Sequence, residues 1–263
     1  MELSRTSGPQ RAVPQIELNA VSKQYRNGRL ILDRLTLSVA KGEFVSIIGP
    51  SGCGKSTVLK LISGLSRVTS GEIHVDGMTP KDARETMSFI FQDATLLPWR
   101  TVRANVGLGL ELERIPAEKR NAKVDSLLEL VGLSNVSKAY PRELSGGMKM
   151  RVSVARALAT GPRLLLMDEP FAALDEISRD RLNEELLRLR EEQKWTVVFV
   201  THSVPEAVFL SDRIIILAPN PGRIHADVPI DLPHPRTAEL RTTANYEQKV
   251  VEISRLLREA RAS

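Results

Sequence analysis

The sequence predicts an α/β fold in which helices cover both faces of a mostly parallel β-sheet. Three observations support this prediction. Apolar runs of strand length alternate along the chain with longer amphipathic or charged runs of helix length. Runs such as LLLM and IIILA contain no polar residue, as is typical of parallel strands buried on both faces. A glycine-rich stretch, GPSGCGKS, lies between one such strand and a helix.

The elements are expected in a fixed order. Strands are predicted at 16–25 and 35–49 with a turn at RNG between them, and the second strand leads through the glycine-rich loop into a helix. A short strand follows at GEIHVDG. The chain from 81 to 159 is mostly helical, and buried strands then return. The helices of that part are predicted at 100–113, 117–133 and 146–160, and the later strands at 163–170, 195–202 and 213–219.

Two further helices are predicted nearer the C-terminus. A charged helix over 178–193 lies between the first two of those later strands, with Glu184 and Arg188 at i,i+4 spacing. The segment 219–236 is rich in proline and is expected to form loops with strand pieces. The chain ends in an amphipathic helix over 246–260, whose apolar stripe is expected to dock onto the body.

Composition and charge describe an ordinary globular protein. Its 263 residues are 42% hydrophobic and 26% charged, which suffices for a sizeable core, and the 4% aromatic content makes that core mainly aliphatic. The net charge of +5 comes without a dense basic run. This balance favours surface charge and phosphate-binding residues over a nucleic-acid partner, and it also fits work near an anionic membrane.

Cysteine content and the apolar runs bear on cellular location. The single cysteine, Cys53, excludes an internal disulfide and suits a reducing compartment. The polar N-terminus has no apolar signal segment, so residues 1–14 are expected to form a flexible arm. All apolar runs are far shorter than a membrane span. We therefore expect a cytoplasmic protein that reaches a membrane only through a partner.

The stretch GPSGCGKS matches the pattern G-x-x-x-x-G-K-[ST] in the strand–loop–helix context that this pattern requires. Its glycines allow successive backbone N–H groups to converge on one anion, and the helix start adds its positive end. Lys55 is expected to reach the β- and γ-phosphates, and the Ser56 hydroxyl to bind Mg²⁺. No third glycine follows as in a dinucleotide fingerprint, so the ligand is a nucleoside triphosphate. The expected contacts are Gly49, Pro50, Ser51, Gly52, Cys53, Gly54, Lys55, Ser56 and Thr57.

Cys53 occupies a variable position of this loop. One interpretation is a small residue that simply fits there. The other is a reactive thiol, because a helix N-terminus favours the thiolate.

Polar residues follow two of the buried strands. Asp168 and Glu169 come directly after LLLM, at the sheet edge where ligands bind in such folds. Asp168 is the expected Mg²⁺ carboxylate, and Glu169 is expected to polarise the attacking water. His202 ends the run TVVFVTH, which predicts a bond to the γ-phosphate or, alternatively, a structural role.

Gln92 and Tyr25 are two further candidates. Gln92 follows the strand-like run FIF, where its amide could touch Mg²⁺ or the attacking water. Tyr25 lies just before the RNG turn and could stack on the adenine ring, or be an exposed tyrosine at a strand end.

A second glycine-containing stretch, LSGG at 144–147, opens another helix. Ser145 is a good N-cap, so a capped helix is one interpretation, and an anion bound at the helix start is another. The order of the motifs decides between them: the phosphate loop, FQ, LSGG, LLLMDEP, ALD and TH. This order resembles that of the ATP-binding cassette (ABC) ATPases from about Ile16 to Leu217, and LSGG is specific to that family among phosphate-loop proteins.

The resemblance implies a fold and a domain division. The fold is a P-loop NTPase (RecA-like) core with an antiparallel β-subdomain and an inserted α-helical subdomain. The ATPase domain would cover 15–220, with the helical subdomain at about 93–160. Residues 221–263 would form a C-terminal extension that ends in the terminal helix.

The resemblance also implies a dimer with ATP at its seam. Two copies would pack head to tail, each lending Ser145, Gly146 and Gly147 to the γ-phosphate that the other holds on Lys55. Asp175, in AALD, would lie at the seam and couple the two sites, and it can also cap the helix that follows.

The activity that the resemblance implies is ATP hydrolysis that drives transport. LSGGM, LLPWRTV and PGRI resemble the nitrate/sulfonate/taurine branch of ABC importers, which suggests a small anion as the solute. The family usually has Gln after the two glycines; Met148 stands here, which puts any bond of that Gln side chain in doubt. Exporter or lipoprotein-release ATPases and non-transport cassettes remain alternatives, whereas Glu169 and His202 argue against a non-catalytic subunit.

Membrane permease subunits are the implied partners, with a solute-binding protein acting indirectly. The protein would then lie on the inner face of the membrane. The segment DATLLPWRTV, with Leu97 and Trp99, would form a groove for a cytoplasmic helix of the permease, or alternatively would pack inside the helical subdomain.

Overall fold

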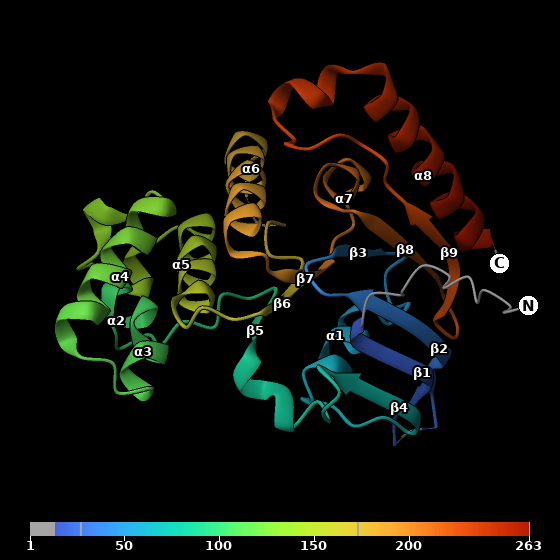
Figure 1. Cartoon of the computed structure of the whole chain (residues 1–263), viewed down its shortest axis with the longest axis horizontal. Coiled ribbons are helices and arrows are strands. Elements are labelled where there is room, and N and C mark those ends of the chain that lie inside the picture. Colours follow the sequence, from blue (N-terminus) through green and yellow to red (C-terminus); the bar gives the residue numbers. More distant parts are fainter. Residues whose placement is uncertain (1–13, 27, 173, 263) are drawn as a thin grey trace, which may run out of the picture.

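The computed structural model of the chain describes residues 14–26, 28–172 and 174–262. Its strands form two sheets (Figure 1). The smaller is antiparallel, with strand order β2-β1-β4. Its strands are β1 (Pro14–Gln24), β2 (Leu30–Ala40) and β4 (Ser70–Val75).

The larger sheet has six strands in the order β5-β6-β7-β3-β8-β9. All neighbours are parallel except β9, which runs antiparallel to β8. Every residue of β3, β6 and β7 is buried, which confirms the interpretation of the apolar runs. The strands are β3 (Phe44–Ile48), β5 (Met87–Ile90), β6 (Leu164–Asp168), β7 (Thr196–Val200), β8 (Arg213–Ala218) and β9 (Arg223–Pro229).

The helices surround this sheet. In Figure 1, α2 to α5 form a group on one side, and α7 and α8 cover the part of the sheet around β8. The α-helices are α1 (Lys55–Ile62), α2 (Val102–Val106), α3 (Leu108–Leu112), α4 (Ala117–Leu130), α5 (Gly146–Ala159), α6 (Glu176–Gln193), α7 (Val204–Leu210) and α8 (Ala244–Ala262). Short 3₁₀ helices are η1 (Asp82–Thr86), η2 (Ser134–Val136), η3 (Pro141–Glu143) and η4 (Ala238–Thr242).

The α/β fold with its antiparallel sheet and inserted helices is as predicted. The domain boundaries at 15, 93, 160 and 221 stay a proposal. The predicted arm at 1–14 lies outside the described residues except for Pro14, which already belongs to β1. None of the helices in the described part of the chain combines the length and apolar character that crossing a membrane requires.

Four local features differ from the predictions. The strand expected at 35–49 is two strands, the second half of β2 and the whole of β3, and they belong to different sheets. The helix expected at 100–113 is two helices, α2 and α3, which meet at Gly107. A Cβ atom there would lie 3.3 Å from Val124 Cγ2 of α4, so the break allows close packing, and glycine itself favours it. Arg188 pairs with Glu185 and Glu192 instead of Glu184, because both acids also lie within reach on the helix surface. Helix α7 was not predicted.

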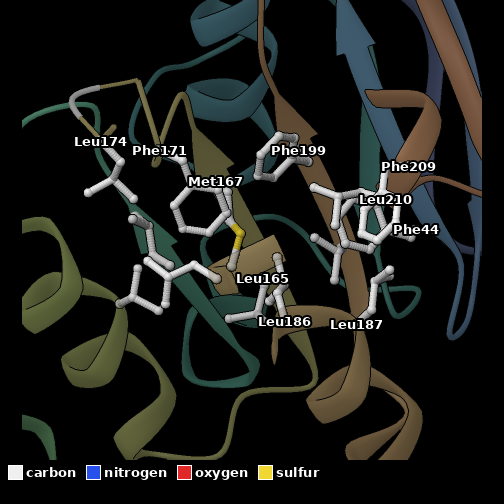
Figure 2. Close-up of a cluster of buried hydrophobic side chains, with 14 of the residues drawn as sticks. Phe44, Leu165, Met167, Phe171, Leu174, Leu186, Leu187, Phe199, Phe209 and Leu210 are labelled. Carbon is white, nitrogen blue, oxygen red and sulfur yellow. The ribbon is translucent and has the colours of Figure 1, made fainter. Parts of the chain in front are cut away.

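Two hydrophobic clusters enclose the large sheet. One combines a face of the sheet with residues of α2 to α8. It contains the packed rings of Phe44, Phe171 and Phe199, and the centroid of Phe199 lies 5.8 Å from that of Phe44 and 5.9 Å from that of Phe171 (Figure 2). The other lies between the two sheets and α1, and is mostly aliphatic. The strand ends that carry the predicted site are therefore held from both faces.

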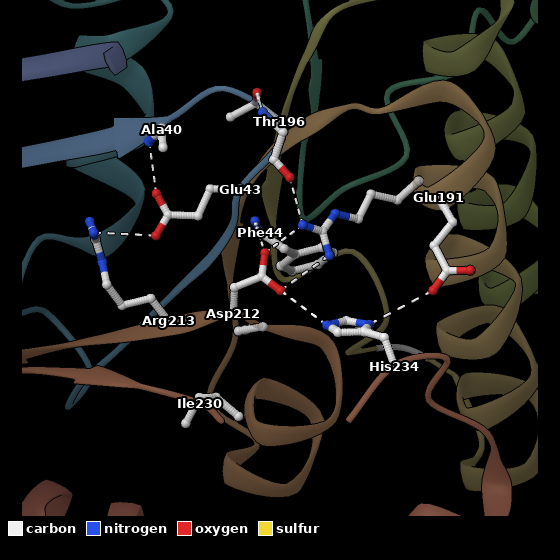
Figure 3. A network of polar contacts seen from close by, with 12 residues as sticks. Ala40, Glu43, Phe44, Glu191, Thr196, Asp212, Arg213, Ile230 and His234 are labelled. Carbon is white, nitrogen blue, oxygen red and sulfur yellow. Dashed lines mark hydrogen bonds and ion pairs between the residues drawn. The ribbon is translucent and has the colours of Figure 1, made fainter. Parts of the chain in front are cut away.

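A polar network ties the opposite end of the large sheet to the C-terminal part of the chain (Figure 3). The Asp212 carboxylate accepts from the Phe44 N–H at 2.9 Å and pairs with Arg190 of α6. His234 lies between Asp212 and Glu191, with N···O distances of 3.4 and 3.7 Å. The network connects β3, α6 and the segment after β9.

Candidate active site

The loop between β3 and α1 requires two of its glycines. A Cβ atom at Gly49 would lie 2.7 Å from both the Leu217 carbonyl oxygen and the Cys53 sulfur. Gly54 has a φ of +100°, and a Cβ atom there would lie 2.5 Å from Leu32 Cδ2. A side chain at either position would push the loop away from β8 or β2. The packing against both strands fixes the course of the loop.

Helix α1 begins in this loop with a positive end that no side chain caps. Its N-cap, Gly54, has no side chain, and the first turn contains no acidic residue. No side-chain oxygen therefore competes with an anion for the first N–H groups. Lys55 is 8% exposed, and its Nζ donates to the carbonyl oxygens of Gly49 (2.9 Å) and Pro50 (3.0 Å). A buried ammonium group beside such N–H groups suits a polyphosphate.

Ser56 and Asp168 meet at the ends of their elements. Ser56 Oγ donates to Asp168 Oδ1 at 2.8 Å, and Asp168 is buried. Burial raises the pKa of Asp168, while the bond from Ser56 lowers it. A hydroxyl and a carboxylate are the hard oxygen donors that Mg²⁺ accepts, with phosphate and water oxygens completing its shell.

The Ser56–Asp168 pair fits a metal ion that arrives with a nucleotide. The described residues contain no group of three or more His, Cys, Asp or Glu side chains placed to hold a metal ion by themselves. A Mg²⁺ ion here would therefore take most of its oxygen ligands from phosphate and water.

Glu169 and His202 lie together at the same edge of the sheet. His202 Nδ1 is 3.1 Å from Glu169 Oε2. The Glu169 side chain is 20% exposed and that of His202 is 64% exposed, so water can reach the pair. Glu169 has a φ of +48°, a left-handed conformation that costs energy in a non-glycine residue and persists only where the surrounding structure holds it. Its N–H donates to the Val200 carbonyl oxygen of β7 at 2.9 Å, which holds this conformation in place.

Most of the predicted phosphate-site residues border one cavity of 480 Å³. It joins the loop to Gln92, which follows β5, and to Glu169, which follows β6. Asp168 and His202 touch this group through their bonds to Ser56 and Glu169. The lining consists of Tyr25, Arg29, Ile31, Ser51, Gly52, Gly54, Lys55, Ser56, Thr57, Gln92 and Glu169.

The hairpin between β1 and β2 supplies the far wall of this cavity. Tyr25 is 44% exposed, and Lys23 Nζ lies 5.2 Å from its ring centroid. The Tyr25 N–H donates to the Arg29 carbonyl oxygen at 3.0 Å, so the turn places Arg29 and Ile31 beside the ring. Sequence reasoning missed these two residues. The RNG turn was the available signal, since a tight turn returns the chain to its starting point; its Asn lies outside the described residues.

Cys53 has the environment of a packing residue. Its side chain is fully buried, and burial raises the pKa of the thiol despite the nearby Lys55 ammonium. The thiolate is therefore disfavoured, and the reactive-thiol interpretation is wrong. Only the backbone of this residue is placed to face an anion in the loop.

The second glycine-containing stretch has a different geometry. Ser145 Oγ accepts from the Met148 N–H at 3.3 Å, so α5 has the side-chain cap that α1 lacks. Ser145 and Gly146 are exposed, whereas a Cβ atom at Gly147 would lie 2.8 Å from Leu174 Cδ2. The Met148 side chain is partly buried and packs against the hydrophobic cluster that contains Phe44, Phe171 and Phe199.

Asp175 caps α6 as the sequence suggested. Its carboxylate accepts from the Ser178 N–H at 2.9 Å, and this bond lowers the pKa of the carboxyl group. Leu174, which packs on Gly147, is its neighbour in the chain. The stretch 145–147 and Asp175 thus share one surface region, and neither contributes to the lining of the 480 Å³ cavity.

Comparisons with known proteins agree with this geometry. The family described as ABC transporter matches residues 32–172. An uncharacterised ABC transporter ATP-binding protein of Methanocaldococcus jannaschii is 47% identical over 222 residues, which cover 84% of this chain and 83% of that protein. An aliphatic sulfonates import ATP-binding protein of Bacillus licheniformis is 46% identical over 222 residues, covering 84% and 86%.

A solved structure shows the same fold. It is the dimeric structure of an ATP-binding cassette in a post-hydrolysis state, bound to ADP and Pi. Its TM-score with this chain is 0.76 at 34% identity, and the match covers 82% of this chain and 99% of that one. The phosphate loop, the carboxylates after β6 and the LSGG helix therefore lie in a chain whose sequence and fold match one known family. This chain belongs to the ABC transporter family, as an ATP-binding cassette.

Proposed function

We propose that this ABC ATPase binds ATP with Mg²⁺ in the 480 Å³ cavity and hydrolyses it with Glu169 as the general base. One observation carries the proposal: Lys55, the Ser56–Asp168 pair and the Glu169–His202 pair converge at one end of the sheet. Tyr25 would stack on the adenine ring, and the loop N–H groups from Gly49 to Thr57 would surround the phosphates.

Each remaining group has a role in the proposed reaction. Bound Mg²⁺ would neutralise charge on the phosphate oxygens, held by Ser56, Asp168 and the amide of Gln92. Glu169 would take a proton from the attacking water. His202 contacts Glu169 through Nδ1, which leaves its Nε2 to donate to a γ-phosphate oxygen.

The binding site for the γ-phosphate would be completed by a second copy of this chain. Ser145, Gly146 and Gly147 start a helix at an exposed position outside the cavity of their own chain. In a head-to-tail dimer they would bring the positive end of α5 to the partner's ATP. The related cassette of known structure is dimeric, which supports this arrangement. Asp175 would then lie at the seam beside the same surface.

The dimer would energise an importer by binding membrane permease subunits. Trp99 is 71% exposed, and Leu96 and Leu97 beside it are half-buried. An exposed tryptophan in an apolar segment between Gln92 and α2 is suited to receive a partner helix. The chain would then be cytoplasmic and peripheral on the inner face of the membrane.

The solute would be a small anion such as an alkanesulfonate, taurine or nitrate. The support is the name of several relatives, aliphatic sulfonates import ATP-binding protein, at 41–46% identity. A solute-binding protein would deliver the anion to the permease outside the membrane, so the ATPase itself would not touch it.

Reconstitution with the co-purified permease tests this function. Vesicles that contain the complex should hydrolyse ATP faster when a binding protein loaded with an alkanesulfonate is added, and should not respond to the unloaded binding protein. Trp99→Glu should abolish this stimulation while ATP binding persists. If no anion-loaded binding protein stimulates hydrolysis, or if Trp99→Glu is stimulated like the wild type, the importer role or the docking surface is wrong.

A further inference from the structure

The C-terminal extension, residues 221–263, contacts α7, the helix that follows His202, at several points. Helix α7 is short, and all of its residues except Pro205 are buried. Segments after β9 hold it at both ends and along its side. The following contacts connect the extension, through α7, to the catalytic edge of the sheet.

The first contact is at the beginning of α7. Tyr246, in the first turn of α8, is 6% exposed, and its Oη donates to the Pro205 carbonyl oxygen at 2.9 Å. Burial raises the pKa of this phenol, so the hydroxyl keeps its proton at neutral pH and remains a donor. Pro205 is three residues after His202.

The second contact is at the end of α7. Arg236 is 4% exposed, and its Nη1 donates to the carbonyl oxygens of Phe209 (3.0 Å) and Ser211 (2.8 Å). Burial lowers the pKa of this guanidinium to about 10, which still leaves it charged at neutral pH. A cation at the carbonyl end of a helix is stabilising, so Arg236 acts as a C-terminal cap supplied from outside.

The third contact lies along the side of α7. The Arg241 guanidinium lies 3.8 Å from the centroid of the Phe209 ring and pairs with Asp180 of α6 at 2.9 Å. Ile253 and Leu257 of α8 add apolar packing in the same cluster as Phe209. The helix is thereby fixed between α6 and α8.

Helix α7 in turn holds the turn that carries His202. Glu206 of α7 is 5% exposed, and its Oε2 accepts from the Thr201 hydroxyl. The same Thr201 oxygen accepts from the Ser203 N–H at 3.0 Å. The residues on both sides of His202 are thus bonded to each other and to α7, while the His202 ring itself is mostly exposed and bonds Glu169.

We propose that the C-terminal extension positions His202 against Glu169 by clamping α7, with Tyr246, Arg236 and Arg241 as positioning residues. This inference rests on the proposed ATPase role of Glu169 and His202. The solved cassette above is matched almost completely by 82% of this chain, so part of this chain lies outside what the two share. The clamp gives the extension a function in the catalytic site without contact to substrate.

Tyr246→Phe tests the clamp in the full-length chain, because it removes only the hydroxyl that reaches Pro205. We expect kcat for ATP hydrolysis to fall about three- to tenfold with KM for ATP unchanged. Arg255→Ala is the matched control, since Arg255 lies on the same helix, is exposed, and pairs with Glu259 of that helix. Its kcat should equal that of the wild type.

Two further readouts separate positioning from general stability. In a His202→Ala background, Tyr246→Phe should cause no additional loss of kcat, because the contact acts through His202. An equal loss in both backgrounds would overturn the proposal. The NMR signal of the His202 ring should shift in Tyr246→Phe and stay in place in Arg255→Ala; an unmoved signal in both would also overturn it. This signal needs no turnover, so the clamp can be judged even if the chain proves inactive as an ATPase, which would refute the proposed function instead.

Discussion

Two glycine-containing stretches, 49–56 and 144–147, each open a helix, and the structure completes them differently. The first has no side-chain cap, and Lys55 bonds the carbonyl oxygens of its own loop. Residues that follow β1, β5 and β6, namely Tyr25, Gln92 and Glu169, line the same cavity as this loop. The second is capped by its own Ser145, is exposed, and lies outside that cavity.

The difference between these two helix starts indicates which of them forms a binding site within one chain. A helix start that is short of capping groups, beside a buried cation and a cavity, is prepared for a ligand on its own. A helix start that caps itself and faces solvent folds without a ligand, and it gains a role only when another surface brings an anion to it. The first stretch therefore predicts ATP binding by a single chain, and the second predicts a contact between chains.

Glu169→Gln should give the largest effect, because it separates hydrolysis from binding. Removing a general base typically costs 10² to 10⁴ in rate, whereas the loop that binds the phosphates is untouched. Phosphate release should fall by about that factor, with the Kd for ATP essentially unchanged. Glu72→Gln changes an exposed carboxylate of β4, is the control, and should hydrolyse ATP normally. A fully active Glu169→Gln variant would remove Glu169 from the mechanism.

Lys55→Met should weaken ATP binding at the first glycine-containing stretch and leave the second stretch unchanged. A buried ammonium group bonded to phosphate contributes about 1.5–3 kcal/mol, so ATP affinity should fall about 10- to 150-fold in the isolated chain. Calorimetric titration measures this directly. Lys60→Met changes an exposed lysine of the same helix and should leave the affinity as it is. Equal losses in both variants would mean that net charge, and not the loop geometry, binds ATP.

Tyr25→Ala should weaken the same single-chain site by less. Base stacking on an aromatic ring is worth about 1–3 kcal/mol, which corresponds to a Kd for ATP about 5- to 150-fold higher. Because Tyr25 is 44% exposed, we expect the low end of this range, about tenfold. Tyr25→Phe keeps the ring and should bind ATP like the wild type. Because stacking concerns the base, both variants should bind inorganic triphosphate equally well; a difference there would contradict the assignment.

Ser145→Ala should have the smallest effect on ATP binding by one chain. Its effect should be on the ATP-driven association of two chains. ATP affinity of the isolated chain should be unchanged, while ATP-driven dimerisation weakens about fivefold through the loss of one hydrogen bond of about 1 kcal/mol. Thr101→Ala is a matched control, since Thr101 caps α2 by accepting from the Ala104 N–H at 3.3 Å. Both changes remove one N-cap, and only Ser145→Ala should affect the dimer. Sedimentation velocity at several protein concentrations distinguishes them.

Local pattern was enough to predict the parts of the site that lie on regular elements. The strands β6 and β7 are recognisable by their apolar composition, and β3 is the apolar end of the strand predicted at 35–49. The residues that follow parallel strands meet at one sheet edge. That geometry brings Ser56, Asp168 and Glu169 together without knowledge of any contact. The glycine pattern likewise locates the start of α1.

Long-range packing decided the parts that the sequence did not reveal. Helix α7 is almost wholly buried, so it has no polar face to give a helical period. Arg29 reaches the cavity only because the β1–β2 hairpin turns tightly. Cys53 could be reactive or inert by sequence, and only its burial between the loop and β8 decides the question. The proposed clamp on α7 depends on contacts between residues that lie 25 or more positions apart in the sequence. The positions of Tyr246 and Pro205, for example, differ by 41.

The central claim is that one γ-phosphate is held by Lys55 of one protomer and by the Ser145 turn of its partner. Light scattering of Glu169→Gln at equilibrium with ATP and Mg²⁺ tests it most directly. We expect the mass to double with ATP and to remain that of one chain with ADP, which lacks the γ-phosphate. A variant that stays monomeric with saturating ATP, both alone and bound to its permease, would contradict the account.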